Sequence, residues 1–154
     1  MDKFSTADCR PLCVLISKGT KLSIDVCPKS PSEVEEMSRV PYASAVANLM
    51  YDMVYTRLDI AQAVGVLSRF MANPGRVHWD VVKQVFRYLR GTSNYSIFYH
   101  CNSSRAPHSI FIHGFVDSDW ASDIDSRRST SGYVFTMFGG AISWMSKQQP
   151  VVAL

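Results

Sequence analysis

The strongest constraint on the fold is a change in the spacing of apolar residues near Gly91. Before this glycine, apolar side chains recur every three or four positions, as in Val82, Val85, Phe86 and Leu89, which is the period of a helix with one buried face. After it, β-branched and aromatic residues form short runs separated by glycine and polar residues, which is typical of strands. Helices and strands are therefore segregated along the chain, and this order predicts an α+β fold with an antiparallel sheet.

Three helices with short connections are expected before Gly91. The first begins near Pro41, because proline suits the first turn of a helix. The second covers residues 59–71 and ends at Asn73-Pro74-Gly75, and the third covers residues 78–90. Together they predict a small antiparallel helical bundle over residues 40–91.

The rest of the chain divides into a lead-in and a meander. Residues 1–38 are punctuated by proline and glycine, so we expect a poorly structured lead-in with one strand-like piece at residues 21–26. Gly139-Gly140 suits the tight turn of a hairpin, because glycine accepts a positive φ. An antiparallel β-meander is expected over residues 95–146, with strand-like runs at residues 95–99, 110–116, 133–138 and 141–145.

The composition excludes several classes of protein. The 154 residues are 47% hydrophobic and 19% charged, a globular balance that argues against disorder. The apolar runs are far shorter than the roughly 18 residues of a membrane span. The four scattered cysteines do not form a disulfide framework, and the N-terminus lacks the apolar core of a secretory signal. We therefore expect an intracellular protein, cytoplasmic or nuclear, with no membrane partner.

The densest group of carboxylates follows a strand-like run and comprises Asp117, Asp119, Asp123 and Asp125. Asp117 and Asp119 lie two positions apart, so both side chains are expected on the same face of a strand. Carboxylates grouped in this way can hold divalent cations, and a pair of ions can drive phosphodiester hydrolysis. The alternative, which the spacing alone favours, is that these aspartates cap a turn. A calcium loop is a poor match, because Arg128 stands where the bidentate glutamate belongs.

Basic residues predominate in the helical part, although the net charge of the chain is only +3. Arginine and lysine side chains could follow the phosphates of a nucleic acid, whereas a solvated helix face and a polar turn explain them nearly as well. The candidate nucleic-acid-binding residues are Arg69, Arg76, Lys83, Arg87, Arg90, Arg127 and Arg128.

Ordered sequence blocks across residues 18–154 resemble the Pol polyprotein of copia-type LTR retrotransposons of plants. The blocks include Val40-Pro-Tyr-Ala-Ser-Ala-Val46, Asn73-Pro-Gly75, Arg87-Tyr-Leu-Arg-Gly-Thr92, Asp117-Ser-Asp-Trp-Ala121 and Gly140-Ala-Ile-Ser-Trp144. In that family, this stretch follows the reverse transcriptase palm, runs through a helical thumb-like region and enters the ribonuclease H domain. The resemblance implies a thumb/connection-like region over residues 39–92 and a truncated ribonuclease H-like domain, with an incomplete sheet, over residues 93–154.

By this resemblance, Asp117 matches the first metal-binding carboxylate of ribonuclease H, and Mg²⁺ is the cofactor of the intact family. The polymerase aspartates are expected upstream of Met1, and the other ribonuclease H carboxylates are expected beyond Leu154. One carboxylate cannot hold two ions about 4 Å apart, so we expect Asp117 to be vestigial and to bind no Mg²⁺ stably. Leu58 and Asp52 also depart from the family pattern. The resemblance thus implies a catalytically inactive remnant that binds RNA or DNA weakly at most.

Two further expectations concern protein partners. Arg87-Tyr88-Leu89-Arg90 fits the Arg-x-Leu-Arg pattern of secreted oomycete effectors, so an alternative function is a domesticated or effector-like protein that binds a host protein. Against it, Leu89 lies on the apolar stripe of a predicted helix, and no signal peptide is recognised upstream. In addition, an incomplete sheet would leave the strand at residues 110–116 with an open backbone edge, which predicts self-association.

Overall fold

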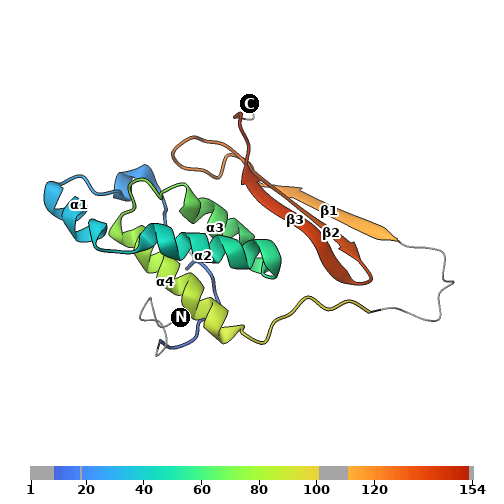
Figure 1. Ribbon diagram of the computed structural model, residues 1–154. Coiled ribbons are helices and arrows are strands. Elements are labelled where there is room, and N and C mark those ends of the chain that lie inside the picture. Colours follow the sequence, from blue (N-terminus) through green and yellow to red (C-terminus); the bar gives the residue numbers. More distant parts are fainter. Residues whose placement is uncertain (1–8, 18, 101–110, 153–154) are drawn as a thin grey trace. The chain divides into compact units, whose positions relative to one another are not determined.

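The computed structural model describes residues 9–17, 19–100 and 111–152. The chain divides into two compact units, residues 1–95 and residues 96–154. The first unit contains the helices and the second contains a three-stranded antiparallel sheet (Figure 1). The predicted α+β fold class is therefore confirmed.

Three helices of the first unit, α2 (Tyr42–Tyr55), α3 (Ala61–Ser68) and α4 (Arg76–Gly91), correspond to the three predicted from the sequence. A short 3-10 helix, η3 (Leu58–Ile60), leads directly into α3. The second helix is shorter than expected, because α3 ends at Ser68 and turns follow it.

One hydrophobic core joins these three helices. The Tyr42 side chain is 2% exposed, and its hydroxyl donates a hydrogen bond to the Leu67 carbonyl at 2.9 Å. Tyr42 thereby satisfies its polar atom inside the core, as burial requires. The core side chains are Tyr42, Ala45, Val46, Leu49, Ile60, Ala63, Val64, Leu67, Val81, Val82, Val85, Phe86 and Leu89.

The start of α4 is fixed by His78 and Gly75. The Gly75 N–H donates to His78 Nδ1 at 2.8 Å, and the His78 ring stacks on Phe70 with ring centroids 4.0 Å apart. Gly75 also lies against the backbone of Val26, since a Cβ at this position would lie 2.0 Å from the Val26 carbonyl oxygen. The Asn-Pro-Gly turn therefore serves two purposes: it ends the preceding helical segment and admits a close backbone contact.

The expected poorly structured lead-in is wrong for residues 31–38, which form helix α1 (Pro31–Ser38). The cause is a capping box: the Ser30 hydroxyl accepts from the Glu33 N–H at 3.3 Å, and Glu33 Oε2 accepts from the Ser30 N–H at 3.1 Å. Hydrogen bonds from the backbone of Lys29 and Ser30 also hold the pKa of Glu33 below its ordinary value. The strand-like piece at residues 21–26 is wrong as well, because Ile24–Val26 form a 3-10 turn, η2.

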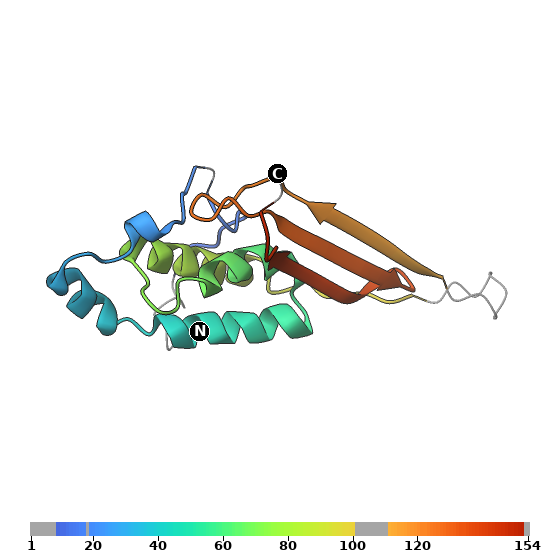
Figure 2. The same cartoon turned by 90° about the horizontal axis from the view of Figure 1, so that it is seen from above.

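The second unit consists of β1 (Ile112–Ser118), β2 (Thr130–Met137) and β3 (Gly140–Gln148). Figure 2 shows β2 between its two neighbours, and both pairings are antiparallel. These strands confirm three of the four predicted runs, although Ile110 at the start of one run lies outside the described residues. The fourth run, residues 95–99, is not a strand. Instead, the Tyr99 hydroxyl donates to the Ala141 carbonyl at 2.6 Å.

The hairpin turn between β2 and β3 lies one residue before the predicted position. Its two loop residues are Phe138 and Gly139, with φ of 52° and 80°, while Gly140 pairs with Met137 inside the ladder. Gly140 is needed in the strand for another reason: a Cβ there would lie 2.5 Å from the Tyr99 ring. The close approach of Tyr99 thus accounts for this glycine, and Phe138 adopts the left-handed conformation in its place.

Candidate metal site and nucleic-acid interface

Asp117 lies near the end of β1, directly opposite Gly132 of β2, and its side chain is exposed to solvent. A shallow open depression beside it is lined by Val116, Ser118, Tyr133 and Met145, among others. The Asp117 carboxylate makes no hydrogen bond or ion pair with any residue that the structure describes. Its two oxygens are therefore available to solvent, a cation or another chain.

Asp119 is committed to the loop that follows β1. Its Oδ1 accepts from the Thr130 N–H at 2.8 Å, its Oδ2 accepts from the Ser122 hydroxyl at 2.6 Å, and its own N–H donates to the Thr130 carbonyl at 3.1 Å. Burial is the largest influence on this carboxyl and opposes ionisation, but the hydrogen bonds from Ser122 and Thr130 together lower its pKa. Asp119 thus closes the loop onto the start of β2.

Asp123 anchors the same loop from inside and is 7% exposed. Its Oδ2 accepts hydrogen bonds from the Ser126 N–H at 2.9 Å, from the Ser126 hydroxyl and from Gln148 Nε2 at 2.9 Å. Its backbone N–H and C=O pair with Arg128 and Arg127. The same loop holds two non-glycine residues in the left-handed conformation, with φ of 51° at Ala121 and 56° at Arg127. The Arg127 N–H donates to the Asp123 carbonyl, and the Ala121 N–H donates to the Ser129 hydroxyl at 3.0 Å.

The geometry therefore separates the aspartates that the sequence placed together. Asp119 and Asp123 cap a turn, as the alternative reading of the sequence predicts, and Asp117 lies beyond them on the strand. Across residues 9–17, 19–100 and 111–152, no group of three histidine, cysteine, aspartate or glutamate side chains could hold a metal ion. These residues do not fit a two-ion site of the kind that cleaves phosphodiesters.

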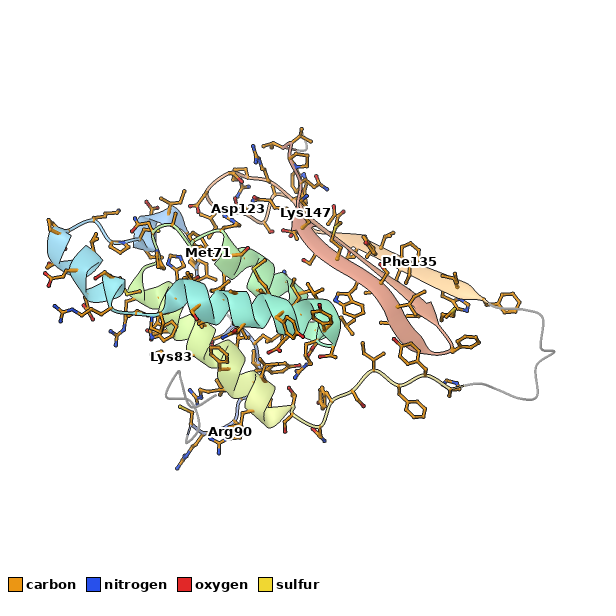
Figure 3. The ribbon with its side chains drawn as sticks, in the orientation of Figure 1. Met71, Lys83, Arg90, Asp123, Phe135 and Lys147 are labelled. Carbon is orange, nitrogen blue, oxygen red and sulfur yellow. The ribbon has the colours of Figure 1, made fainter. Side chains whose placement is uncertain are left out.

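The basic residues of α4 lie along one side of the helix, since Lys83, Arg87 and Arg90 are four and three positions apart. Lys83 and Arg90 mark this side in Figure 3. Arg76 is paired with Glu36 at 2.8 Å and Lys83 with Asp80 at 2.6 Å. Much of the positive charge at the start of this stripe is therefore compensated within the protein.

The remaining arginines of α4 bind the backbone of the N-terminal segment. Arg87 Nε donates to the Arg10 carbonyl at 2.8 Å, and Arg90 Nη1 donates to the Cys9 carbonyl at 2.8 Å. A hydrogen bond to a carbonyl does not neutralise an arginine, so Arg87, Arg90 and the neighbouring Arg10 form a basic surface on the described part of the helical unit.

The other three candidates are not part of this stripe. The Arg69 guanidinium lies over the Phe70 ring, 5.4 Å from its centroid. Arg127 is exposed in the loop after β1 and Arg128 is half-buried there, close in sequence to the aspartates that anchor the loop. The structure therefore divides the candidate nucleic-acid-binding residues between the two units.

A further polar cluster, which the sequence analysis missed, lies at one end of the bundle. Arg57 donates to both oxygens of Asp59, at 2.9 and 2.7 Å, and to the Thr92 hydroxyl at 2.6 Å. The Tyr88 hydroxyl donates to Asp59 at 2.9 Å, and the Arg57 guanidinium lies 5.6 Å from the centroid of the Tyr88 ring. The Arg57 side chain is only 11% exposed. These partners lie up to 35 residues apart, so no local spacing indicates the cluster.

Electrostatics within this cluster favour the charged pair. Burial is the largest influence on Asp59 and opposes ionisation, but the hydrogen bonds from Arg57 and Tyr88 together lower its pKa. The pKa of Arg57 is raised, chiefly by its hydrogen bonds to Asp59. Both partners are therefore held in their ionised forms. Their hydrogen bonds to Tyr88 and Thr92 join the segment that begins η3 to the C-terminal end of α4.

Within the described part of the chain, the helices are too short or too polar to cross a membrane.

Comparisons with known proteins show which proteins the chain is similar to. The chain is 47% identical over 154 residues to the retrovirus-related Pol polyprotein from transposon TNT 1-94 of Nicotiana tabacum, and it covers 11% of that protein. It is 34% identical over 140 residues to the Pol polyprotein from transposon RE2 of Arabidopsis thaliana, of which it covers 9%. It is also 50% identical over 118 residues to Secreted RxLR effector protein 161 of Plasmopara viticola, covering 77% of this chain and 80% of that protein.

No protein-family model and no solved structure matches the chain. The chain spans about a tenth of the length of the Pol polyproteins it matches. The similarity to TNT 1-94 nevertheless extends over its whole length, through both the helical unit and the sheet. The chain belongs to the copia-type retrotransposon Pol polyprotein family.

Proposed function

We propose that the chain corresponds to the thumb/connection-like region and the beginning of the ribonuclease H-like domain of a Pol polyprotein, and that it has no nuclease activity of its own. The order of a helical unit followed by an antiparallel sheet supports the first part. The observation that carries the second part is the isolation of Asp117. Asp119 and Asp123, the carboxylates nearest in sequence on its C-terminal side, accept hydrogen bonds that hold the loop together.

The purified chain is expected not to cleave the RNA strand of an RNA·DNA hybrid in Mg²⁺ or Mn²⁺, because one exposed carboxylate cannot position two ions. The measurement is gel analysis of a labelled hybrid, with an active ribonuclease H as the positive control. Asp117→Asn is the matched variant and should behave like the parent chain. Metal-dependent cleavage that disappears in Asp117→Asn would overturn the proposal.

We further propose that the chain binds nucleic acids weakly and without sequence preference. Among the described residues, Arg87 and Arg90 have no carboxylate partner on their side of α4, whereas Arg76 and Lys83 are already paired with carboxylates. Binding of this kind is driven by the release of counterions from phosphates, and dissociation constants of roughly 10⁻⁴–10⁻⁶ M are typical of it.

Arg87→Gln is expected to reduce the slope of log K against log salt concentration by about 0.9 for duplex DNA, if its side chain contacts one phosphate. Fluorescence anisotropy over a salt series measures the slope. Lys21→Gln removes the same charge at an exposed position outside α4 and should leave the slope unchanged. Tight binding that does not respond to salt would contradict a phosphate-driven mode.

The effector-like alternative is supported by the name of one relative, Secreted RxLR effector protein 161. The Arg87-Tyr88-Leu89-Arg90 pattern itself lies in the last turns of α4, where Leu89 is 5% exposed and belongs to the hydrophobic core. Arg87 and Arg90 are engaged with the N-terminal segment. A segment recognised by a partner must be accessible, so this pattern has the features of a structural element, and we favour the Pol-derived function.

A further inference from the structure

The outer edge of β1 is open in the part of the chain that the structure describes. β1 pairs with β2 on one side only, and all seven of its residues are exposed. Three apolar side chains of β1 are strongly exposed, Ile112 at 60%, Phe115 at 63% and Val116 at 81%. An edge of this kind presents a row of backbone donors and acceptors to another strand.

One hydrogen bond shows which backbone groups point outward. The Asp119 N–H donates to the Thr130 carbonyl, directly after the ladder pair of Ser118 and Ser131. Backbone groups alternate between the two sides of a strand, so the odd-numbered residues of β1 turn their N–H and C=O toward β2. The outward-facing groups therefore belong to the even-numbered residues, Ile112, Gly114, Val116 and Ser118.

We propose that this edge binds the same edge of a second copy of the chain, antiparallel, about a two-fold axis at Phe115. In this register, Gly114 faces Val116 of the second copy and Ile112 faces its Ser118, so outward-facing groups meet outward-facing groups. The arrangement is self-complementary, as a two-fold interface requires. It uses all seven residues of β1 and joins the two sheets into one of six strands.

Charge complementarity selects this register. About an axis at Phe115, His113 of each copy lies opposite Asp117 of the other, so the pair forms twice. Both pairs occupy the positions without backbone hydrogen bonds, where facing Cα atoms are only about 4.5 Å apart and side chains contact most closely. An imidazole N–H of His113 can donate to the exposed Asp117 carboxylate. A two-fold axis at Gly114 or Val116 would no longer place His113 opposite Asp117. It would instead place His113 or Asp117, respectively, opposite Phe115.

The face that carries these side chains adds no competing charge. On β2, the residues opposite His113, Phe115 and Asp117 are Thr136, Val134 and Gly132. On β3, the residues next in register are Ala141, Trp144 and Ser146. His113 and Asp117 are therefore the charged or titratable side chains of this face, and each has its complement on the second copy.

The test is a pair of charge variants measured by sedimentation equilibrium of the full chain. Asp117→Lys removes the carboxylate acceptor opposite each His113 and puts an ammonium group in its place, and His113→Asp places two anionic pairs across the interface. Each variant alone should raise the dimer dissociation constant about tenfold or more. Asp117→Lys loses both hydrogen bonds from His113, and His113→Asp sets like charges directly opposite each other, which destabilises a strand pair. An equimolar mixture of the two should restore dimers, since the introduced lysine then faces the introduced aspartate and the remaining His113 faces the remaining Asp117 carboxylate.

The control is Asp25→Lys, which makes the same charge change at a side chain that is 90% exposed in the helical unit. It should dimerise like the parent chain. Hydrogen exchange provides a second measurement: the amides of Ile112, Gly114, Val116 and Ser118 should become protected as the concentration rises. A chain that stays monomeric at all concentrations, or a dimer that survives both single variants, would overturn the proposal, and the latter would indicate association through an apolar sheet face.

Discussion

Asp59→Ala is expected to destabilise the helical unit by about 2–3 kcal/mol. The substitution removes the carboxylate partner of Arg57, whose side chain is only 11% exposed, and it leaves the Tyr88 hydroxyl without its acceptor. Arg57 then keeps only its hydrogen bonds to Thr92. Breaking a buried ion pair from one side costs about 3–5 kcal/mol, and the 30% exposure of Asp59 places this case at or below the lower end. Urea unfolding followed by circular dichroism at helical wavelengths measures the change.

Asp80→Ala is the matched control, because it removes an aspartate ion pair from the same unit at the surface. The Asp80 and Lys83 side chains are 49% and 37% exposed, and exposed pairs contribute about 0–1 kcal/mol. If the two variants lost the same stability, the Arg57 cluster would be no more than an ordinary surface pair.

The cost of Asp59→Ala should depend on pH. The pKa of Asp59 is lowered in the folded chain, so its contribution to stability is complete above the ordinary aspartate pKa of about 3.9. It is lost as the pH falls through the lowered folded-state value. The difference in unfolding free energy between the parent chain and Asp59→Ala should therefore shrink below about pH 4, and a constant difference would exclude the ion pair as its cause.

The helical core was predictable because periodicity encodes it. Val82, Val85, Phe86 and Leu89 form one stripe in the sequence and one buried face of α4 in the structure. Helix α1 was missed although its signal is local: Ser30 and Glu33 form a capping box around Pro31. Prolines in the lead-in suggested irregular structure, but proline at the first helical position is compatible with a helix.

Interactions between distant residues could not be predicted. Arg57 meets Thr92 across 35 residues, and Tyr99 packs against Gly140 across the second unit. The second contact also explains the displaced hairpin turn, because it requires glycine within the strand and leaves Phe138 in the turn. Side-chain contacts of this type depend on how the elements pack, which the spacing of residues along one element does not specify.

The candidate site was likewise predictable from the sequence only in part. The spacing of Asp117 and Asp119 indicated a shared strand face, but β1 ends at Ser118 and the Asp119 carboxylate turns to Thr130. Period-2 alternation applies only while the strand continues. The spacing alone favoured loop capping by these aspartates, and the hydrogen bonds of Asp119 and Asp123 support that interpretation.

Asp123→Ala should open the loop between β1 and β2 and cost the sheet unit about 2 kcal/mol. The side chain is 7% exposed, and its loss leaves the Ser126 N–H and the Gln148 amide without a carboxylate acceptor. Hydrogen bonds to a charged group contribute about 1.5–3 kcal/mol each, part of which water recovers here. The loop backbone would also be freed from its left-handed conformation at Arg127.

Trypsin provides the measurement, because Arg127 and Arg128 lie in this loop and become cleavable when it opens. At 1.4 kcal/mol per factor of ten, a loss of about 2 kcal/mol should raise the cleavage rate roughly 30-fold. Asp117→Ala is the matched control: its carboxylate is exposed, so the rate should change less than about threefold at concentrations that keep the chain monomeric. Equal acceleration by both variants would mean that Asp117 also holds the loop, and the structural distinction between the two aspartates would be wrong.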